Sequence, residues 1–420
     1  MNRRLFLQRS GALAVLAAGG RVLAEGAMPS LGEEATRRLV DFISKEMSVR
    51  HIPGLSACLV HRDGRVLWSR NFGYANLATK EAMSFNHLQN VASISKTIVT
   101  LAAMQQVESG LMSLDDNINR YLPFQLQHPK HPNQELTVRM LMRHESAIRD
   151  GSVYSRNYAC GDPRMSLGVW VREYFEKGGI FYEADENFAP SAPGERYEYA
   201  NTSFGLLGHI VERTSGLSLP DYCERNIIAP MGLTGTAWML SDLDTEKHSV
   251  PYTWVEGGKL RGSTWGGIPL GVIRPDGPTY GERLADGYHN NCLYNHPNYP
   301  DGFLRMSMVD ATQWARLWLG NGRIDGVRML KEETVQQMFT DESAGPDAGS
   351  LQGLTWHSGH ELGGMRLWGH DGSDPGVATS LLLAKEAGLA AIVFSNTDGI
   401  TPSDFTVQIL REGLMAIKRA

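Results

Sequence analysis

Closely spaced metal ligands are missing from the 420-residue sequence. It contains only four cysteines and no Cys-x-x-Cys pair, and its 13 histidines are scattered without a His-Glu-x-x-His segment. Because zinc sites draw on such groups, we expect neither a metal site nor a cofactor. The sequence also has no Gly-x-Ser-x-Gly segment, which argues against the nucleophile elbow of the α/β-hydrolases.

Long apolar runs and an excess of positive charge are also missing. The apolar stretch at residues 11–20 is too short to span a bilayer comfortably, and no other candidate follows it. The formal net charge is −6, and it becomes −10 without the first 24 residues, which hold four arginines and no acid. We therefore expect no membrane span in the mature chain and no nucleic-acid partner.

The N-terminus resembles an export signal. Arg3 and Arg4 lie in a segment like a twin-arginine motif, the apolar stretch follows, and Val22-Leu23-Ala24 is a plausible cleavage site. A cytoplasmic amphipathic helix or a retained anchor is the alternative. We expect residues 1–24 to be a signal peptide and the mature chain, residues 25–420, to be periplasmic. A periplasm permits disulfides, and Cys160 and Cys292 could pair, but the sequence leaves that open.

Regular patterns are concentrated at the two ends of the mature chain. Near the start we expect a helix and two strands, and near the end three strands and three helices; their ranges are 35–47, 55–61, 66–74, 309–319, 331–339, 365–370, 377–384, 389–395 and 404–417. The five strands can form one antiparallel sheet flanked by helices. Between these ends we expect helices at 114–121, 137–143 and 202–214, separated by long loops. With no linker or repeat, the pattern favours a single domain, with a sheet region at about 35–110 and 305–420 and a helical and loop region at about 111–304.

One buried helix carries an unusual pair of polar residues. Apolar residues recur at helical spacing from Ile94 to Val107, which predicts a helix with little polar surface. Ser93 opens this helix and Lys96 follows one turn later. A desolvated lysine is pushed towards its neutral form, which can take the proton of a serine hydroxyl. The alternative is an N-cap serine followed by a lysine that reaches the surface.

Two further segments are candidates for the same site. Tyr199 and Asn201 lie two apart before a helix, so they point the same way if the segment is extended. A cation nearby would lower the pKa of the Tyr199 phenol and let it transfer protons, whereas the alternative is a packed aromatic beside an N-cap asparagine. His370-Asp371-Gly372 closes a strand, with Ser373 next, and would let a substrate backbone approach; the alternative is a surface turn. His357-Ser358-Gly359 matches the same pattern, but we expect no strand after it.

Together these motifs resemble the serine β-lactamase-like family of class C β-lactamases, penicillin-binding DD-peptidases, D-aminopeptidases and esterases. Ser93-x-x-Lys96, Tyr199-x-Asn201 and His370-x-Gly372 occur in the family's order, and the resemblance covers roughly residues 35–415. It extends to the flanking segments at 91–97, 114–123, 136–146 and 193–208. The resemblance implies an α/β fold of α+β type, β-lactamase/transpeptidase-like, with an antiparallel sheet, flanking helices and an adjoining all-helical region.

The resemblance also implies roles for these residues. Ser93 would be the acylated nucleophile, Lys96 and Tyr199 would share acid–base work, and Asn201 and His370 would orient substrate. Gly372 would lie in the substrate-binding strand, and the backbone N–H groups of Ser93 and Ser373 would form the oxyanion hole.

The chain departs from the family pattern in two places. His-Asp-Gly replaces Lys-Thr-Gly, and a neutral histidine binds carboxylates less well than lysine does. Ala147 stands where the family often has glycine, which would strain a turn that needs positive φ.

These observations favour a serine hydrolase that forms an acyl-enzyme on a small-molecule or peptide substrate. D-amino-acid peptides or small carboxylic esters would be the substrates. The alternatives are a non-catalytic sensor that binds penicillin or peptidoglycan, and a weak β-lactamase. The sequence does not indicate the oligomeric state.

Overall fold

A computed structural model describes residues 31–261, 264–265, 268–269, 271–278, 284–340, 342–347 and 349–419. The expected signal peptide at residues 1–24 lies outside these residues. No helix in the described ranges combines the length and the apolar character needed to cross a bilayer. Nor do these residues contain a cluster of three or more His, Cys, Asp or Glu side chains that could hold a metal ion.

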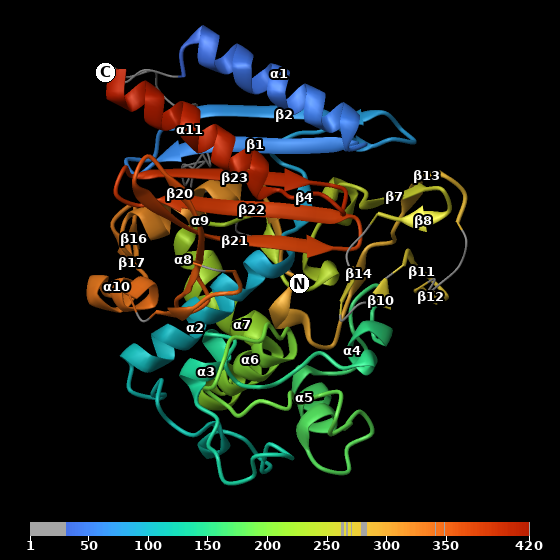
Figure 1. Cartoon of the computed structure of the whole chain (residues 1–420), viewed down its shortest axis with the longest axis vertical. Coiled ribbons are helices and arrows are strands. Elements are labelled where there is room, and N and C mark those ends of the chain that lie inside the picture. The colour runs from blue at the N-terminus through green and yellow to red at the C-terminus, as the bar shows by residue number, and fades with distance from the viewer. Residues whose placement is uncertain are drawn as a thin grey trace, which may run out of the picture.

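A nine-stranded sheet runs through the molecule (Figure 1). Its strands, in spatial order, are β18 (Ser343–Ala344), β19 (Leu351–Gln352), β20 (His357–Leu362), β21 (Met365–Asp374), β22 (Val377–Ala384), β23 (Leu389–Ser395), β1 (Gly54–His61), β2 (Val66–Asn76) and β3 (Glu81–Ala82). All neighbouring pairs are antiparallel, and Cys58 of β1 lies opposite Ile392 of β23. The predicted five-stranded antiparallel core is therefore confirmed.

Alternating side chains of the central strands pack against different helices. In β1, Leu55 and Leu59 belong to an apolar cluster with α1 (Glu33–Val49) and α11 (Ser403–Arg419). Cys58 and Val60 point the other way, into the larger core that includes α9 (Met308–Leu319). Helices therefore cover both faces of the sheet, which explains why β22 and β23 are buried throughout and mostly apolar.

A helical region adjoins the sheet beyond β21 (Figure 1). Its helices are α2 (Ser95–Glu108), α3 (Val138–Met142), α4 (Ser152–Arg156), α5 (Leu167–Phe175), α6 (Thr202–Ser215), α7 (Leu219–Cys223) and α8 (Ala229–Met231), while α10 (Glu332–Thr340) follows α9. The buried helix α2 packs against α6. The helix expected at 114–121 is wrong, because only the turn Ile118–Arg120 is helical; the Asn117 side chain caps it by accepting the Asn119 N–H at 3.0 Å.

The loop-rich segment at 249–300 forms small sheets beside the helical region. The remaining short strands are β4 (Leu88–Asn90), β5 (Ala159–Cys160), β6 (Thr236–Ala237), β7 (Tyr252–Glu256), β8 (Lys259–Leu260), β9 (Thr264–Trp265), β10 (Ile268–Pro269), β11 (Ile273–Arg274), β12 (Gly277–Pro278), β13 (Gly287–Asn290), β14 (Tyr294–Asn295), β15 (Arg305–Ser307), β16 (Arg323–Ile324) and β17 (Val327–Arg328). Of these, β14 pairs with β5.

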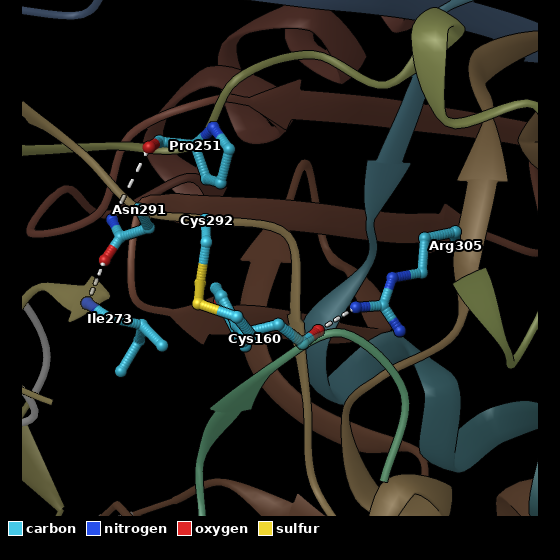
Figure 2. Close-up of a disulfide and its surroundings, with 7 residues drawn as sticks. Cys160, Pro251, Ile273, Asn291, Cys292 and Arg305 are labelled. Atoms are coloured by element: carbon cyan, nitrogen blue, oxygen red, sulfur yellow. Dashed lines mark hydrogen bonds between the residues drawn. A yellow bond between two sulfur atoms is a disulfide. The ribbon is translucent and has the colours of Figure 1, made fainter. Parts of the chain in front are cut away.

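A disulfide fastens this segment to the helical region. Cys160 and Cys292 are bonded, with 5.7 Å between their Cα atoms and 132 residues between them in sequence. Figure 2 shows that Asn291, the neighbour of Cys292, ties two further loops together: its Oδ1 accepts from the backbone of Ile273 at 2.7 Å and its amide reaches the carbonyl of Pro251. The pairing that the sequence left open is thus present. Cys58 and Cys223 remain free and buried.

Candidate active site

Ser93 lies in a short 3₁₀ turn, Ala92–Ile94, that leads into α2. The α-helix begins at Ser95, so Ser93 precedes it and makes no N-capping hydrogen bond. The predicted buried helix is confirmed, but the alternative of a capping serine is wrong. The Asn90 side chain stabilises the turn, because its Oδ1 accepts a hydrogen bond from the Ala92 N–H at 2.8 Å. The backbone of Ala92 has a φ of +46°, an uncommon conformation for a residue with a side chain.

Lys96 is completely buried and uses all of its hydrogen-bonding positions. Its Nζ lies 3.1 Å from Ser93 Oγ, 2.7 Å from Asn201 Oδ1 and 2.6 Å from the backbone oxygen of Asp301. The alternative of a lysine that reaches the surface is therefore wrong. Burial lowers the pKa of Lys96 to about 8, although the carboxyl groups of Asp301 and Asp150 oppose that shift. A neutral amine would donate to the two carbonyl oxygens and turn its lone pair to Ser93.

Tyr199 contacts the same hydroxyl from the other side. Its phenol donates a hydrogen bond to Ser93 Oγ at 2.9 Å, and its ring stacks on His144 with 4.2 Å between centroids. The expected lowering of the Tyr199 pKa is wrong: burial raises it, and the hydrogen bond to Ser93 does not offset that rise. Tyr199 is therefore a protonated donor in the resting site.

Asn201 is oriented by a carboxylate that the sequence did not indicate. Asp150 accepts hydrogen bonds from the backbone and side-chain N–H groups of Asn201 and from the backbone of Thr202, each at 2.9 Å. Asp150 thus caps α6, while the Asn201 side chain makes no capping bond. This turns Asn201 Oδ1 towards Lys96. Asp150 lies 51 residues from Asn201 in a loop, so no local pattern could have linked them.

The third motif lies inside strand β21. His370, Gly372 and Ser373 pair with residues of β22, and the chain turns only after Asp374, so the surface-turn alternative is wrong. A Cβ atom on Gly372 would lie 2.6 Å from the backbone oxygen of Val91. Glycine is therefore required for β21 to pack on the turn that carries Ser93.

A second histidine joins this motif. We expected no strand after His357, but His357 begins β20 and pairs with Gly369 of β21. The pairing depends on a bulge and a partner twelve residues away, which strand patterns do not reveal. The rings of His357 and His370 meet edge to face, with 5.3 Å between centroids.

A cavity of about 310 Å³ opens over Ser93. It is lined by Ser93, His144, Tyr197, Tyr199, Pro346, Gln352, His357, His370, Asp371, Gly372, Ser373 and Pro402. Lys96 and Asn201 lie behind Ser93 and do not line the cavity. The structure therefore brings all seven sequence-predicted residues to one place, five at the cavity wall and two behind it. His144, Tyr197 and His357 are lining residues that sequence reasoning did not select.

Comparisons with known proteins show the family of the chain. A family model described as Beta-lactamase matches residues 39–411. Protein flp of Staphylococcus aureus (strain COL) is 23% identical over 239 residues, which are 56% of this chain and 43% of flp. The chain thus spans less than half the length of that curated relative.

Two solved structures share the fold over most of this chain. The octameric penicillin-binding protein homologue from Pyrococcus abyssi has a TM-score of 0.69 at 22% identity, covering 90% of this chain and 77% of that one. The D-amino acid amidase from Ochrobactrum anthropi SV3 has a TM-score of 0.69 at 20% identity, covering 91% and 99%. The fold is therefore of the β-lactamase/transpeptidase-like type. With its family match extending from residue 39 to residue 411, the chain belongs to the Beta-lactamase family.

Proposed function

We propose that this chain is a serine hydrolase that works through an acyl intermediate on Ser93. The observation that carries this proposal is the position of the Ser93 hydroxyl. Its Oγ lies within hydrogen-bonding distance of both Lys96 Nζ and the Tyr199 phenol, at the floor of a cavity. A nucleophile beside a group that can take its proton is the arrangement that acyl transfer requires.

In the acylation step, Ser93 Oγ bonds to the carbonyl carbon while its proton passes to the lone pair of Lys96. The negative charge on the carbonyl oxygen is stabilised by the backbone N–H groups of Ser93 and Ser373. When the tetrahedral intermediate collapses, the bond to the leaving amine or alcohol breaks. Tyr199 gives its proton to that leaving group and regains one from the Lys96 ammonium.

Water then completes the cycle. It attacks the acyl carbon, loses a proton to the Lys96–Tyr199 pair, and expels Ser93 Oγ, which takes that proton back. The net reaction adds one water to an ester or amide and yields an acid and an alcohol or amine. Asn201 holds the Lys96 amine in place, and His370 and Gly372 form the wall along which substrate lies.

The proposed substrates are D-amino-acid peptides or amides and small carboxylic esters. His370 in place of lysine favours these over β-lactams, since a neutral imidazole is a weak partner for a carboxylate. A non-catalytic penicillin or peptidoglycan sensor is the second candidate. The intact Lys96–Ser93–Tyr199 contacts argue against it, because a pure binder needs no buried base.

We further propose that residues 25–420 form the mature periplasmic enzyme, a single domain exported by the twin-arginine route. The Cys160–Cys292 disulfide supports this compartment, because disulfides persist in oxidising surroundings.

The test uses p-nitrophenyl butyrate, an uncharged activated ester, with intact-mass spectrometry of the protein during turnover. We expect p-nitrophenol release and a transient adduct of one butyryl group, both lost in Ser93→Ala, with a fall in rate of about 10⁴-fold. Ser109→Ala, at the exposed end of α2, is the matched control and should keep full activity. Turnover that survives Ser93→Ala would refute the mechanism, whereas stoichiometric acylation without release would support the sensor.

A further inference from the structure

His370 presents a hydrogen-bond acceptor to the cavity. Its Nδ1 lies 2.6 Å from the backbone oxygen of Asp371, and because a carbonyl oxygen can only accept, Nδ1 must carry a proton. Burial holds the pKa of His370 well below its usual value, so the ring is neutral and Nε2 keeps a lone pair. In the described part of the chain, no group donates a hydrogen bond to this Nε2.

His357 extends the same wall with a second imidazole. It is partly exposed to the cavity, and neither of its ring nitrogens hydrogen-bonds to another described residue. Burial lowers the pKa of His357, the carboxylates of Asp371 and Asp347 act to raise it, and His360 acts to lower it. The two neighbouring rings therefore offer nitrogen lone pairs to whatever occupies the cavity.

The charged side chain that lines the cavity is an acid, and the amine of Lys96 lies behind Ser93. Among the described residues that line the cavity are no lysine and no arginine, and Asp371 is the one acid. An adjoining recess of about 670 Å³ shares Tyr199 with the cavity and is lined by Asp150, Asp185, Glu186 and Glu198. The one cation in that recess, Arg149, is paired with Glu198. A positive group entering this cleft meets a favourable potential, and a carboxylate meets an unfavourable one.

We propose that His357, His370 and Asp371 form a specificity wall that selects substrates with a free ammonium group near the scissile carbonyl and rejects those with a carboxylate there. An ammonium group has three N–H donors and no acceptor, so it matches imidazole lone pairs and a carboxylate. A carboxylate only accepts: it meets a lone pair at His370 Nε2 and a negative charge at Asp371, and the N–H of His357 is the one donor that this wall offers it. This selection rests on the proposed function and adds the chemical class of its substrate. Within it, His357 is a specificity residue that lies outside the three motifs of the family resemblance.

The test compares three p-nitroanilides of D-alanine that differ only at the amino nitrogen: the free ammonium, the N-acetyl and the N-succinyl compound. We expect kcat/KM to be at least tenfold higher for the ammonium than for the succinyl compound, with the acetyl compound between them. The variant His357→Lys places a cation on the wall and should lower the ammonium-to-succinyl ratio at least tenfold. The variant His357→Gln, which adds no charge, should lower it less and serves if the lysine variant does not fold.

His360→Lys is the matched control, because His360 lies three residues further along β20 but is exposed and does not line the cavity. We expect it to keep the wild-type ratio. A wild-type ammonium-to-succinyl ratio near one would overturn the proposal. Equal reductions of that ratio by His357→Lys and His360→Lys would overturn it too, since the added charge would then act through the overall electrostatic field and not through the wall. If Ser93 is required to hydrolyse the acetyl compound but the ammonium compound is not preferred, only the specificity wall is refuted. If no compound, p-nitrophenyl butyrate included, is hydrolysed in a way that depends on Ser93, the proposed hydrolase function is refuted, and the wall with it.

Discussion

The amine of Lys96 lies 2.6 Å from the backbone oxygen of Asp301, whereas the carboxyl group of Asp301 points elsewhere and accepts a hydrogen bond from the Tyr154 phenol. The Lys96 amine is thus held by the dipoles of two carbonyl groups and not by an ion pair at hydrogen-bonding distance. A directly bonded carboxylate would stabilise the ammonium form and keep the lysine protonated. Burial lowers the pKa of Lys96 to about 8, where the amine can change protonation state during catalysis.

The first prediction concerns pH. Because the neutral form of Lys96 takes the Ser93 proton and its pKa is about 8, kcat/KM should rise with pH up to that value and then level off. The measurement is a profile from pH 6 to 9.5 with p-nitrophenyl butyrate, whose own charge does not change. Lys96→Arg stays protonated throughout and should lose at least about 10³-fold in activity at every pH. A wild-type profile without this rise would contradict a lysine base.

Removing the Tyr199 hydroxyl should slow chemistry without weakening binding. Tyr199→Phe keeps the ring that stacks on His144 but loses the hydrogen bond to Ser93. We expect kcat to fall about 10²- to 10⁴-fold with little change in KM, measured by steady-state and pre-steady-state kinetics. Tyr197→Phe removes a hydroxyl from the same cavity wall and should change kcat less than tenfold. A defect confined to KM would make Tyr199 a positioning residue.

Loss of the disulfide should weaken both the fold and the site. The bond closes a loop of about 130 residues, so Cys160→Ser combined with Cys292→Ser should lower the free energy of unfolding by about 2–5 kcal/mol. Activity should fall too, because Tyr158, two residues before Cys160, donates to Asp374 beside Ser373. Urea unfolding and ester hydrolysis measure the two effects. A reductant should lower the free energy of unfolding and the activity of the wild type but leave those of the double variant unchanged. Equal sensitivity of the two proteins to the reductant would contradict this prediction.

Two buried acids should make the fold less stable as pH rises. Burial raises the pKa of Asp374 to about 8 and that of Asp301 to about 7, from an ordinary 3.8. Between pH 4 and 8 the folded chain keeps protons that the unfolded chain has released, so stability is lost as pH increases. Asp374→Asn should remove part of this loss, about 1–3 kcal/mol between pH 5 and 8, because its amide cannot ionise.

Thermal unfolding at several pH values tests that prediction. The replacement keeps a side-chain oxygen that can accept from Tyr158, so it is a mild change at the lower pH. Asp185→Asn, at an exposed position, is the control and should not alter the slope of stability against pH. Parallel curves for the wild type and Asp374→Asn would show that Asp374 is ionised in the fold.

Local signals predicted the parts of the fold that local chemistry determines. Strands β22 and β23 were visible as mostly apolar segments joined by a turn, and α6 ends where expected because Gly216 adopts a φ of +73°. Ala147 also follows its sequence-based expectation: the turn does require positive φ, and alanine adopts +54° there. Its backbone oxygen accepts from Ala189 at 2.8 Å, which helps to hold that strained conformation.

What the sequence could not predict depends on partners far along the chain. Asp150 orients Asn201, and His357 reaches His370 through a bulged strand pair, and neither relation leaves a periodic trace. The direction of the Tyr199 pKa shift was predicted wrongly for a related reason. A nearby cation is visible in the sequence as Lys96, but the complete burial that outweighs it depends on packing from several elements.

The contact between Gly372 and Val91 joins positions 281 residues apart, and β21 reaches that contact only as part of a sheet in which β23 pairs with β1. The order in which the chain is synthesised therefore determines when this contact can form. While a ribosome is still making residues 360–395, Ser93 has emerged but lacks the strand that completes its cavity wall. The cavity wall over Ser93 is therefore completed only after residue 395, the last residue of β23, has been made.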